Sequence, residues 1–314
     1  EHYKSNCSLS LPSIDIQYKD YSVWQREYLK DNKLNKLIEY WRNKLNEFEN
    51  LNLKPDYDLR PVNYDYSGSD IFFELNEQTT ACLKKYASKL NISLYSLLLS
   101  AFSLTLSNFT YQNDIIIGTP VSNRIQHEIE NLIGFFINML VLRIKVERCN
   151  KLDEYIKTVS EEVINSQINQ ELPFERLVKE MTIEKDTSKN PIFQVAFLME
   201  NDFGKIKNND QLEIYNSNTN NKQSSKAKYD LTGIVYENNK NIKGTINYAT
   251  KIFNQSSIKH IVENFIHILE EYTLHSNNKS ILLNEVKQTN LLTLNQINEW
   301  NKTDQDYPEL RDVN

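Results

Sequence analysis

The sequence predicts an α/β fold, a two-layer sandwich in which helices pack on one side of a mixed β-sheet. Amphipathic helical stripes occur together with short apolar runs that are typical of buried strands. Helices and strands are mixed without strict alternation, so a mixed sheet with one covered face fits best. The 314 residues are 39% hydrophobic and 25% charged, which is enough apolar material for a sizeable core. Length alone suggests about two domains or lobes.

Apolar residues at helical spacing place the helices. The first clear stripe runs from Trp24 to Phe48, and residues 1–20 before it are expected to be extended or loop-like. Ser93 is expected to cap the helix that follows it, because its hydroxyl can accept a hydrogen bond from an early backbone N–H. Further helices are predicted at about 77–90, 93–109, 151–168, just after Pro173, at 255–274, and around 293–300.

Short apolar runs and turn residues place the strands. Residues 115–117 form a continuous isoleucine run that ends at Gly118 and Pro120, which indicates a buried strand. Residues 200–228 are polar and low in complexity, so they predict a mobile loop with one strand at most. The other predicted strands are 70–75, 136–146, 192–199 and the two arms of a hairpin, 229–237 and 241–249.

Composition excludes several kinds of partner. A net charge of −6 argues against a nucleic-acid partner or an anionic membrane surface, and the chain holds no long apolar run that could span a membrane. Three distant cysteines favour a reducing, cytoplasmic compartment over a disulfide framework. Of the six glycines, the closest two are eleven positions apart, so glycine-rich nucleotide-binding loops are excluded.

No catalytic or metal-binding pattern stands out. His260 and His267 share a helical face but lie two turns, or about 10 Å, apart, which is too far for one ion. The chain contains no His-Glu-x-x-His and no Gly-x-Ser-x-Gly, and Cys82 on an inner helical face is interpreted as a packing group. We therefore expect no metal and no catalytic residue in this chain.

Two segments are unusual for a simple core. In the first, 117–143, a buried strand leads into a loop with Ser122 and Arg124, and a second strand carries Asn138 within an apolar run. A buried amide needs hydrogen-bond partners or a wet cavity, so Asn138 is either a satisfied structural group or a cavity-lining group. Arg124 is either a solvated loop charge or a functional group. The second segment, 169–178, contains Pro173, which suits a first helical turn.

Taken in order, these strings resemble the condensation domain of non-ribosomal peptide synthetases. YKDYSVWQ (18–25), with Tyr18, Tyr21 and Trp24, resembles the family's tyrosine–tryptophan motif. IGTPVSNR (117–124), with Pro120, and LIGFFINMLVLR (132–143), with Gly134, resemble two further motifs, and NQELPFERLV (169–178), with Pro173 and Phe174, resembles a fourth. KPDYDLRP (54–61), PIFQVAFLMEN (191–201), KYDLTGIVYE (228–237) and the linker-like stretch 291–308 are also family-like.

The resemblance implies a fold and a reaction. The family has two chloramphenicol-acetyltransferase-like lobes with a tunnel between them. Phosphopantetheine arms of upstream and downstream peptidyl carrier proteins bring a peptidyl or acyl thioester and an aminoacyl thioester into that tunnel, where a peptide bond forms. No cofactor is expected to bind directly. The implied partners are the N-terminal lobe of the same domain, both carrier proteins and an adjacent adenylation domain.

The family signature His-His-x-x-x-Asp-Gly does not occur in the 314 residues. Because it belongs to the N-terminal lobe, we expect this chain to be the C-terminal lobe and to be inactive alone. The predicted division is an interlobe segment at 1–23, the lobe at 24–280, and a linker toward the adenylation domain at 281–314.

The motif matches also imply the site residues. Arg124, Asn138, Ser122 and Asn169 are predicted to line the substrate tunnel, and the remaining motif residues are expected to be structural. The family often has His where Asn169 stands, and an amide cannot titrate near neutral pH, so only a hydrogen-bonding role survives there. Two alternatives remain open: a non-catalytic docking module of a megasynthetase, and a stand-alone CoA-dependent acyltransferase, which would need a His-x-x-x-Asp that the chain lacks.

Overall fold

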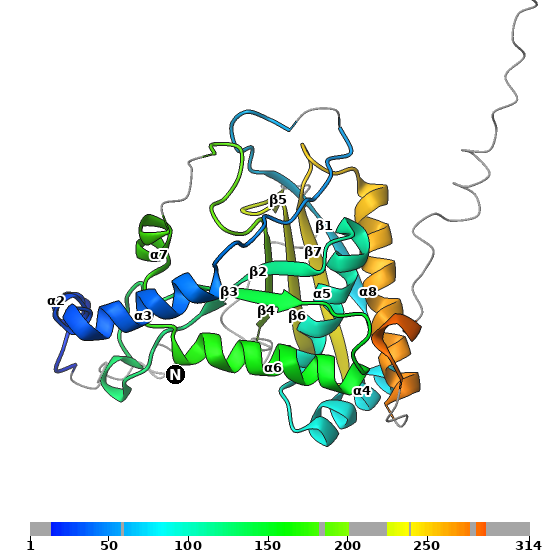
Figure 1. The fold of residues 1–314 in the computed structure, drawn as a ribbon, viewed down its shortest axis with the longest axis horizontal. Helices are drawn as coiled ribbons and strands as arrows, with labels where there is room; N and C mark the ends of the chain where they lie inside the picture. The colour runs from blue at the N-terminus through cyan, green and yellow to red at the C-terminus, as the bar shows by residue number, and fades with distance from the viewer. Residues whose placement is uncertain are drawn as a thin grey trace, which may run out of the picture.

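In the part of the chain that the structure describes, seven strands form one mixed sheet with the order β3-β2-β4-β6-β7-β1-β5 (Figure 1). The computed structural model describes residues 14–57, 60–181, 186–200, 225–238, 240–276 and 281–286. The strands are β1 (Ser67–Glu74), β2 (Asp114–Val121), β3 (Asn138–Lys145), β4 (Val195–Glu200), β5 (Ser225–Lys226), β6 (Leu231–Asn238) and β7 (Asn241–Ala249). β2 is parallel to β4, and β4 is parallel to β6. The other neighbouring pairs are antiparallel. The predicted mixed α/β fold is therefore confirmed.

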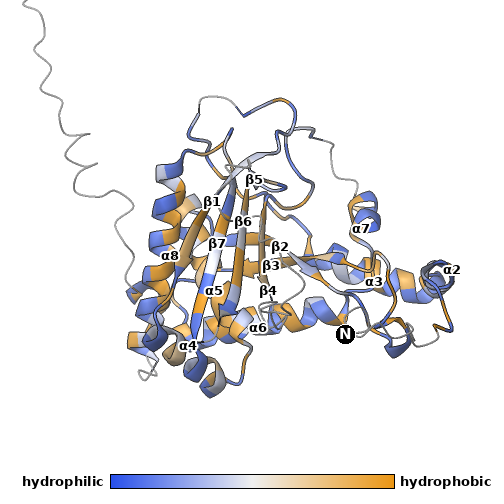
Figure 2. Ribbon diagram, turned by 180° about the vertical axis from the view of Figure 1, so that it is seen from behind, coloured by the Kyte–Doolittle hydropathy of each residue, from blue (hydrophilic) through white to orange (hydrophobic). Residues whose placement is uncertain are grey.

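Helices cover one face of this sheet. The helices are α2 (Tyr18–Tyr28), α3 (Asp31–Lys44), α4 (Glu77–Leu90), α5 (Leu94–Thr110), α6 (Leu152–Ile168), α7 (Phe174–Glu180) and α8 (Gln255–His275), with short turns η1 (His127–Ile129) and η3 (Leu283–Glu285). α4, α5 and α8 lie against the sheet, and α6 packs along α5 and β3 (Figure 1). α8 is apolar toward the sheet and polar on its outer side (Figure 2), as its periodicity predicts.

α5 is the central helix of the core. Every residue from Ser96 to Asn108 is buried, so its hydroxyl groups must be satisfied internally. Ser103 and Thr105 do this by donating to backbone carbonyls one turn earlier, at 2.9 and 2.8 Å. Phe102 stacks on Phe197 of β4 at 4.8 Å between ring centroids. In the described part of the chain no single helix is long and apolar enough to cross a membrane, and α4 and α5 pass that test only as a pair bent by 106°.

The β2–β3 hairpin joins the rest of the sheet at a narrow contact. Within the described strands, β2 pairs with β4 at one position, Gly118↔Ala196. β2 and β3 run steeply across the direction of β4, β6 and β7 in both views (Figures 1 and 2). A Cβ atom on Gly118 would lie 2.1 Å from the Phe193 ring, so only glycine fits at this crossing.

The helices α2, α3 and α7, together with residues 122–137, lie beyond the hairpin end of the sheet (Figure 1), and we call them the arm. Trp41 of α3 and its C-cap residue Leu45 pack with Leu140 of β3 and with Phe193 in a buried cluster distinct from the one beneath the helices. Tyr21 and Phe136 belong to a third, smaller cluster. α2 begins at Tyr18, and a break at Leu29–Lys30 separates it from α3. The prediction that residues 1–20 are extended or loop-like is therefore wrong for residues 18–20, while residues 1–13 lie outside the described part of the chain.

The early start of α2 has a local cause. The Gln17 backbone N–H donates to Asp20 Oδ2 at 2.8 Å, which is one half of a capping box. The helix predicted around 293–300, the linker-like stretch 291–308 and most of the loop predicted at 200–228 lie outside the described residues. The described end of that loop holds the two-residue strand β5.

Candidate functional site

A cleft of about 780 Å³ lies on the sheet face that the helices leave open, and we call it the open-face cleft. Alternation along the strands creates it: Phe73 and Val235 point into the helix-covered core, while their neighbours Phe72 and Ile234 line the cleft. Phe72 is 69% exposed, so this face carries uncovered apolar surface. At its arm end the cleft is lined by residues of the sequence motifs, among them Pro120, Phe135, Asn138 and Phe174.

Asn138 holds the arm end of the cleft in place. Its Nδ2 donates to the carbonyls of Gln170 and Leu172, both at 2.8 Å. Its Oδ1 accepts from the backbone N–H of Met139 at 2.9 Å and of Phe174 at 3.0 Å. Because the amide has two donor hydrogens and two acceptor sites, all of its hydrogen-bonding capacity is used. Asn138 therefore combines the two roles that the sequence left open, since it is a satisfied structural amide and also part of the cleft wall.

The turn after α6 presents the backbone that Asn138 binds. Asn169 ends α6, where its side chain donates to the Asn165 carbonyl at 2.9 Å and its own carbonyl accepts from the Trp41 indole at 3.2 Å. Pro173 lies at the N-cap of α7, with a φ of −59° and a ψ of 137°, one residue before the helical turn in which it was expected. The Phe174 ring then packs against Phe193 at 5.3 Å between centroids. The structure thus brings residues 169–174 beside Asn138, although the Asn169 side chain itself binds the end of α6.

Arg124 stabilises the loop that follows β2. Its guanidinium donates to the Ile129 carbonyl and, at 3.2 Å, to the Glu130 carbonyl. It also lies 4.2 Å from the centroid of the Phe136 ring, a cation–π contact. Neither Arg124 nor the exposed Ser122 is among the side chains that line the open-face cleft. Their tunnel-lining role stays a prediction.

The tyrosine–tryptophan motif attaches α2 to the segment that leads into β3. The Tyr18 hydroxyl donates to the Phe135 carbonyl at 2.9 Å. A Cβ atom on Gly134 would lie 2.3 Å from Tyr18 Cδ2, so this glycine makes room for the tyrosine ring. Tyr21 packs on Phe136 at 4.8 Å, and Trp24 stacks on Tyr28 at 4.6 Å, both between ring centroids. Since α2 runs from Tyr18 to Tyr28, one helix crosses the boundary predicted between residues 23 and 24.

Two arginine–aspartate pairs escaped the sequence prediction. Arg143 pairs with Asp114, with its Nε 3.0 Å from both carboxylate oxygens. It also donates to the Lys44 carbonyl at 2.9 Å, and this bond links the β2–β3 hairpin to the end of α3. Arg60 pairs with Asp230, whose side chain is 1% exposed. Burial raises the pKa of the Asp230 carboxyl, and Arg60 opposes that rise. For Arg143 a signal was present, because it is the only charge in the apolar string 132–143 and a buried charge needs a partner.

Metal ligands do not gather at this site. In the described residues, no three His, Cys, Asp or Glu side chains are placed to hold a metal ion.

Comparison with known proteins decides the family. The family model for the condensation domain matches residues 1–292. The chain belongs to the condensation-domain family. It is 37% identical over 255 residues to N-(5-amino-5-carboxypentanoyl)-L-cysteinyl-D-valine synthase of Amycolatopsis lactamdurans, a match that covers 81% of this chain and 7% of that enzyme. It is 31% identical over 302 residues to bacitracin synthase 3 of Bacillus licheniformis, a match that covers 96% of this chain and 5% of that synthase.

Solved structures agree with the fold of this condensation-domain chain. The X-domain from teicoplanin biosynthesis superposes with a TM-score of 0.76 at 17% identity, over 91% of this chain and 65% of that one. The first condensation domain of the calcium-dependent antibiotic synthetase superposes with a TM-score of 0.68 at 12% identity, over 92% of this chain and 60% of that one. The predicted family resemblance is therefore confirmed, while the matches span only 7% and 5% of the length of the two synthases.

Proposed function

We propose that this chain is the C-terminal lobe of a peptide-bond-forming condensation domain and supplies one wall of its reaction passage. The observation that carries the proposal is the convergence of motif residues from distant parts of the sequence on the open-face cleft. Pro120, Asn138 and Phe174 line its arm end, and the Tyr18 hydroxyl binds the backbone of Phe135, which lines it as well. The exposed apolar side chains on the cleft fit a face that a second lobe covers.

In the proposed reaction, the amine of a carrier-bound aminoacyl group attacks the thioester carbonyl of a carrier-bound peptidyl or acyl group. A C–N bond forms, the C–S bond breaks, the amine loses a proton, and the phosphopantetheine thiol of the upstream carrier takes one up. Holding two tethered reactants in one passage raises their effective concentration, so the lobe contributes mainly position. The signature imidazole that assists the amine would come from the N-terminal lobe.

Within this lobe, the structural roles of the site residues follow from their contacts. Asn138 fixes the 170–174 backbone against β3, so the wall beside the reacting groups keeps its shape. Arg124 keeps the loop after β2 folded over Phe136. The adenylation domain and both carrier proteins complete the proposed assembly.

A cleft-filling substitution tests this function. In the complete condensation domain with both carriers loaded, Thr245→Trp places a large ring in the open-face cleft, and Thr273→Trp on α8 is the matched control at another half-buried threonine. We expect Thr245→Trp to slow dipeptide formation by at least about tenfold, the scale of a steric exclusion from a fitted site, with a melting temperature similar to that of the control.

Other outcomes separate the alternatives. Equal dipeptide rates in the two variants would show that the cleft is not the passage. A complete domain that binds carriers but forms no amide bond would favour a docking module. Transfer of an acyl group from free acyl-CoA would favour a stand-alone acyltransferase. Amide formation by this chain without its partner lobe would show that the lobe needs no outside imidazole.

A further inference from the structure

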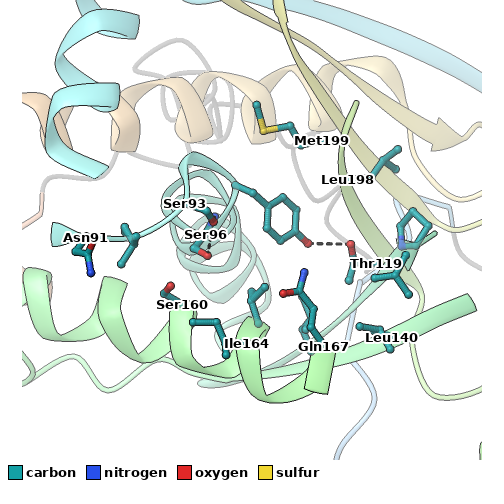
Figure 3. A pocket seen from close by; sticks show the side chains of 16 residues that line it. Asn91, Ser93, Ser96, Thr119, Leu140, Ser160, Ile164, Gln167, Leu198 and Met199 are labelled. Atoms are coloured by element: carbon teal, nitrogen blue, oxygen red, sulfur yellow. Dashed lines mark hydrogen bonds between the residues drawn. The ribbon is translucent and has the colours of Figure 1, made fainter. Parts of the chain in front are cut away.

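A second cavity, of about 480 Å³, lies on the helix-covered side of the sheet between α5 and α6 (Figure 3), and we call it the α5–α6 pocket. Ser160, Ile164 and Gln167 reach toward it from α6, opposite Ser96 on α5 (Figure 3). Its far end is formed where β2, β3 and β4 end, with Thr119 and Met199 among the lining residues. Bond formation in the open-face cleft does not by itself require such a pocket.

The pocket exists because two strands of the sheet separate. β2 and β4 pair at Gly118↔Ala196, after which β2 follows β3 and β4 follows β6. Pro120 and Leu198 each lie two residues beyond that paired position. These two residues line both the α5–α6 pocket and the open-face cleft. The two hollows therefore lie on opposite faces of the sheet and meet at the same pair of residues.

The lining selects for an uncharged occupant. Aliphatic side chains make up much of the wall, and the polar groups are hydroxyls and amides, with no Asp, Glu, Lys, Arg or His among the described residues that line it. The Tyr95 hydroxyl already donates to Thr119 Oγ1 at 2.9 Å, which leaves the end near β2 less polar. A charged group entering this pocket would lose its hydration without gaining an ion pair, which is costly.

We infer that the α5–α6 pocket receives the uncharged, mainly aliphatic side chain of a carrier-bound substrate residue whose reacting group lies in the open-face cleft. The side chain would pass between Pro120 and Leu198. This inference rests on the proposed function, since it takes the open-face cleft to be the passage. If the inference holds, the separation of β2 from β4 determines which substrate side chains the domain accepts.

Methionine methyl resonances test binding without turnover. The sequence has three methionines. Met199 lines the α5–α6 pocket, Met139 lines the open-face cleft, and Met181 lines neither. With ¹³C-methyl-methionine in the complete condensation domain, we expect leucyl-pantetheine amide to shift the Met139 and Met199 signals and aspartyl-pantetheine amide to shift only Met139. A Met199 signal that stays in place, or that moves equally with both probes, overturns the inference.

Selectivity gives the second readout. Ile164→Trp and Met199→Trp narrow the pocket from opposite sides, and Ile168→Trp, one turn further along α6 at a 68% exposed position, is the control. We expect both pocket variants to lower the preference for leucyl over alanyl substrates by at least about tenfold, while the control keeps the preference of the parent. If one of the two pocket variants fails to fold, the other still tests the inference.

The two proposals fail in different ways. Dipeptide formation with unaltered selectivity in both pocket variants would refute the pocket and leave the proposed function standing. The absence of dipeptide from every substrate in the parent domain would refute the proposed function, and the pocket inference with it.

Discussion

The helix-covered face of the sheet and the motif segments beside the arm are held in place by different forces. Beneath the helices, side chains such as Phe102, Phe197 and Phe265 are completely buried in one continuous apolar cluster. In the arm, α3 and α7 also pack on a buried apolar cluster, but the backbone of residues 122–137 and 170–174 is held by single polar or aromatic side chains, among them Arg124 and Asn138. The comparison teaches that burial builds the scaffold, whereas a few directed contacts position the motif segments at the open-face cleft.

This difference explains where the recognisable motifs lie. A buried apolar residue can be exchanged for another of similar size at modest cost, so a core places weak demands on residue identity. Asn138 and Gly134 have no equivalent substitute, because one uses four directed hydrogen bonds and the other leaves room for a ring. The motif positions therefore depend on residue identity, whereas the core depends mainly on residue size.

Alkaline pH should disrupt the helix-covered face completely. Burial raises the pKa of Tyr86, Tyr95, Tyr155 and Tyr272, while tyrosines in the unfolded chain titrate near 10. The folded state therefore holds these protons more tightly, and its stability is lost as pH rises above about 10. We expect phenolate absorbance from these residues to appear together with the loss of helical circular dichroism. Full phenolate absorbance with intact helices would contradict the assignment.

Truncating the scaffold should have the largest effect among single substitutions. Phe197→Ala removes a fully buried ring that stacks on Phe102, and we expect it to lower the free energy of unfolding by about 4 kcal/mol. Chemical denaturation of the complete domain measures this loss. If the free energy of unfolding fell by less than about 1 kcal/mol, the buried face would tolerate substitution as a protein surface does, and the contrast with the arm would be wrong.

Asn138→Ala should cost somewhat less, about 3 kcal/mol, because the carbonyls of Gln170 and Leu172 and the N–H of Phe174 lose their partner. Asn165→Ala, at an exposed amide on α6, is the control and should change stability little. Dipeptide formation should fall together with folding. A stable Asn138→Ala protein with slow chemistry would instead assign the amide to the reaction itself.

Trp24→Ala should have the smallest effect. The indole is 37% exposed and contacts mainly rings of its own helix, so we expect a loss of about 0.5 kcal/mol or less in this chain. Thermal melts of the variant and parent would measure it. A loss comparable to that of Phe197→Ala would mean that the arm is packed like the core.

Apolar periodicity was sufficient to predict the core helices but not the ends of the strands that meet at the cleft. α5 and α8 followed from their apolar spacing, whereas β2 extends past the predicted residues 115–117 and includes Pro120. Proline usually ends a strand, but Pro120 lies opposite Met139, whose N–H bonds the Asn138 side chain instead of β2. Whether a proline fits within a strand depends on this register, which periodicity does not give.

The roles of the site residues depended on contacts that no local pattern contains. Three of the groups that Asn138 binds lie 32 to 36 residues away, so only the fold could decide between a structural amide and a cavity wall. Arg124 matched a motif, but its actual partners are carbonyls five and six residues ahead. Motif order identified the family, while the fold determines which groups Asn138 and Arg124 contact.

The continuity of α2 bears on how synthetase modules are exchanged. A chimaera joined between Val23 and Trp24 would take the two ends of one helix from different parents. Tyr18 would then come from one parent, whereas Gly134 and Phe136, against which it packs, would come from the other. Recombination points for this chain are better chosen before Gln17, so that α2 and Gly134, against which Tyr18 packs, are inherited together.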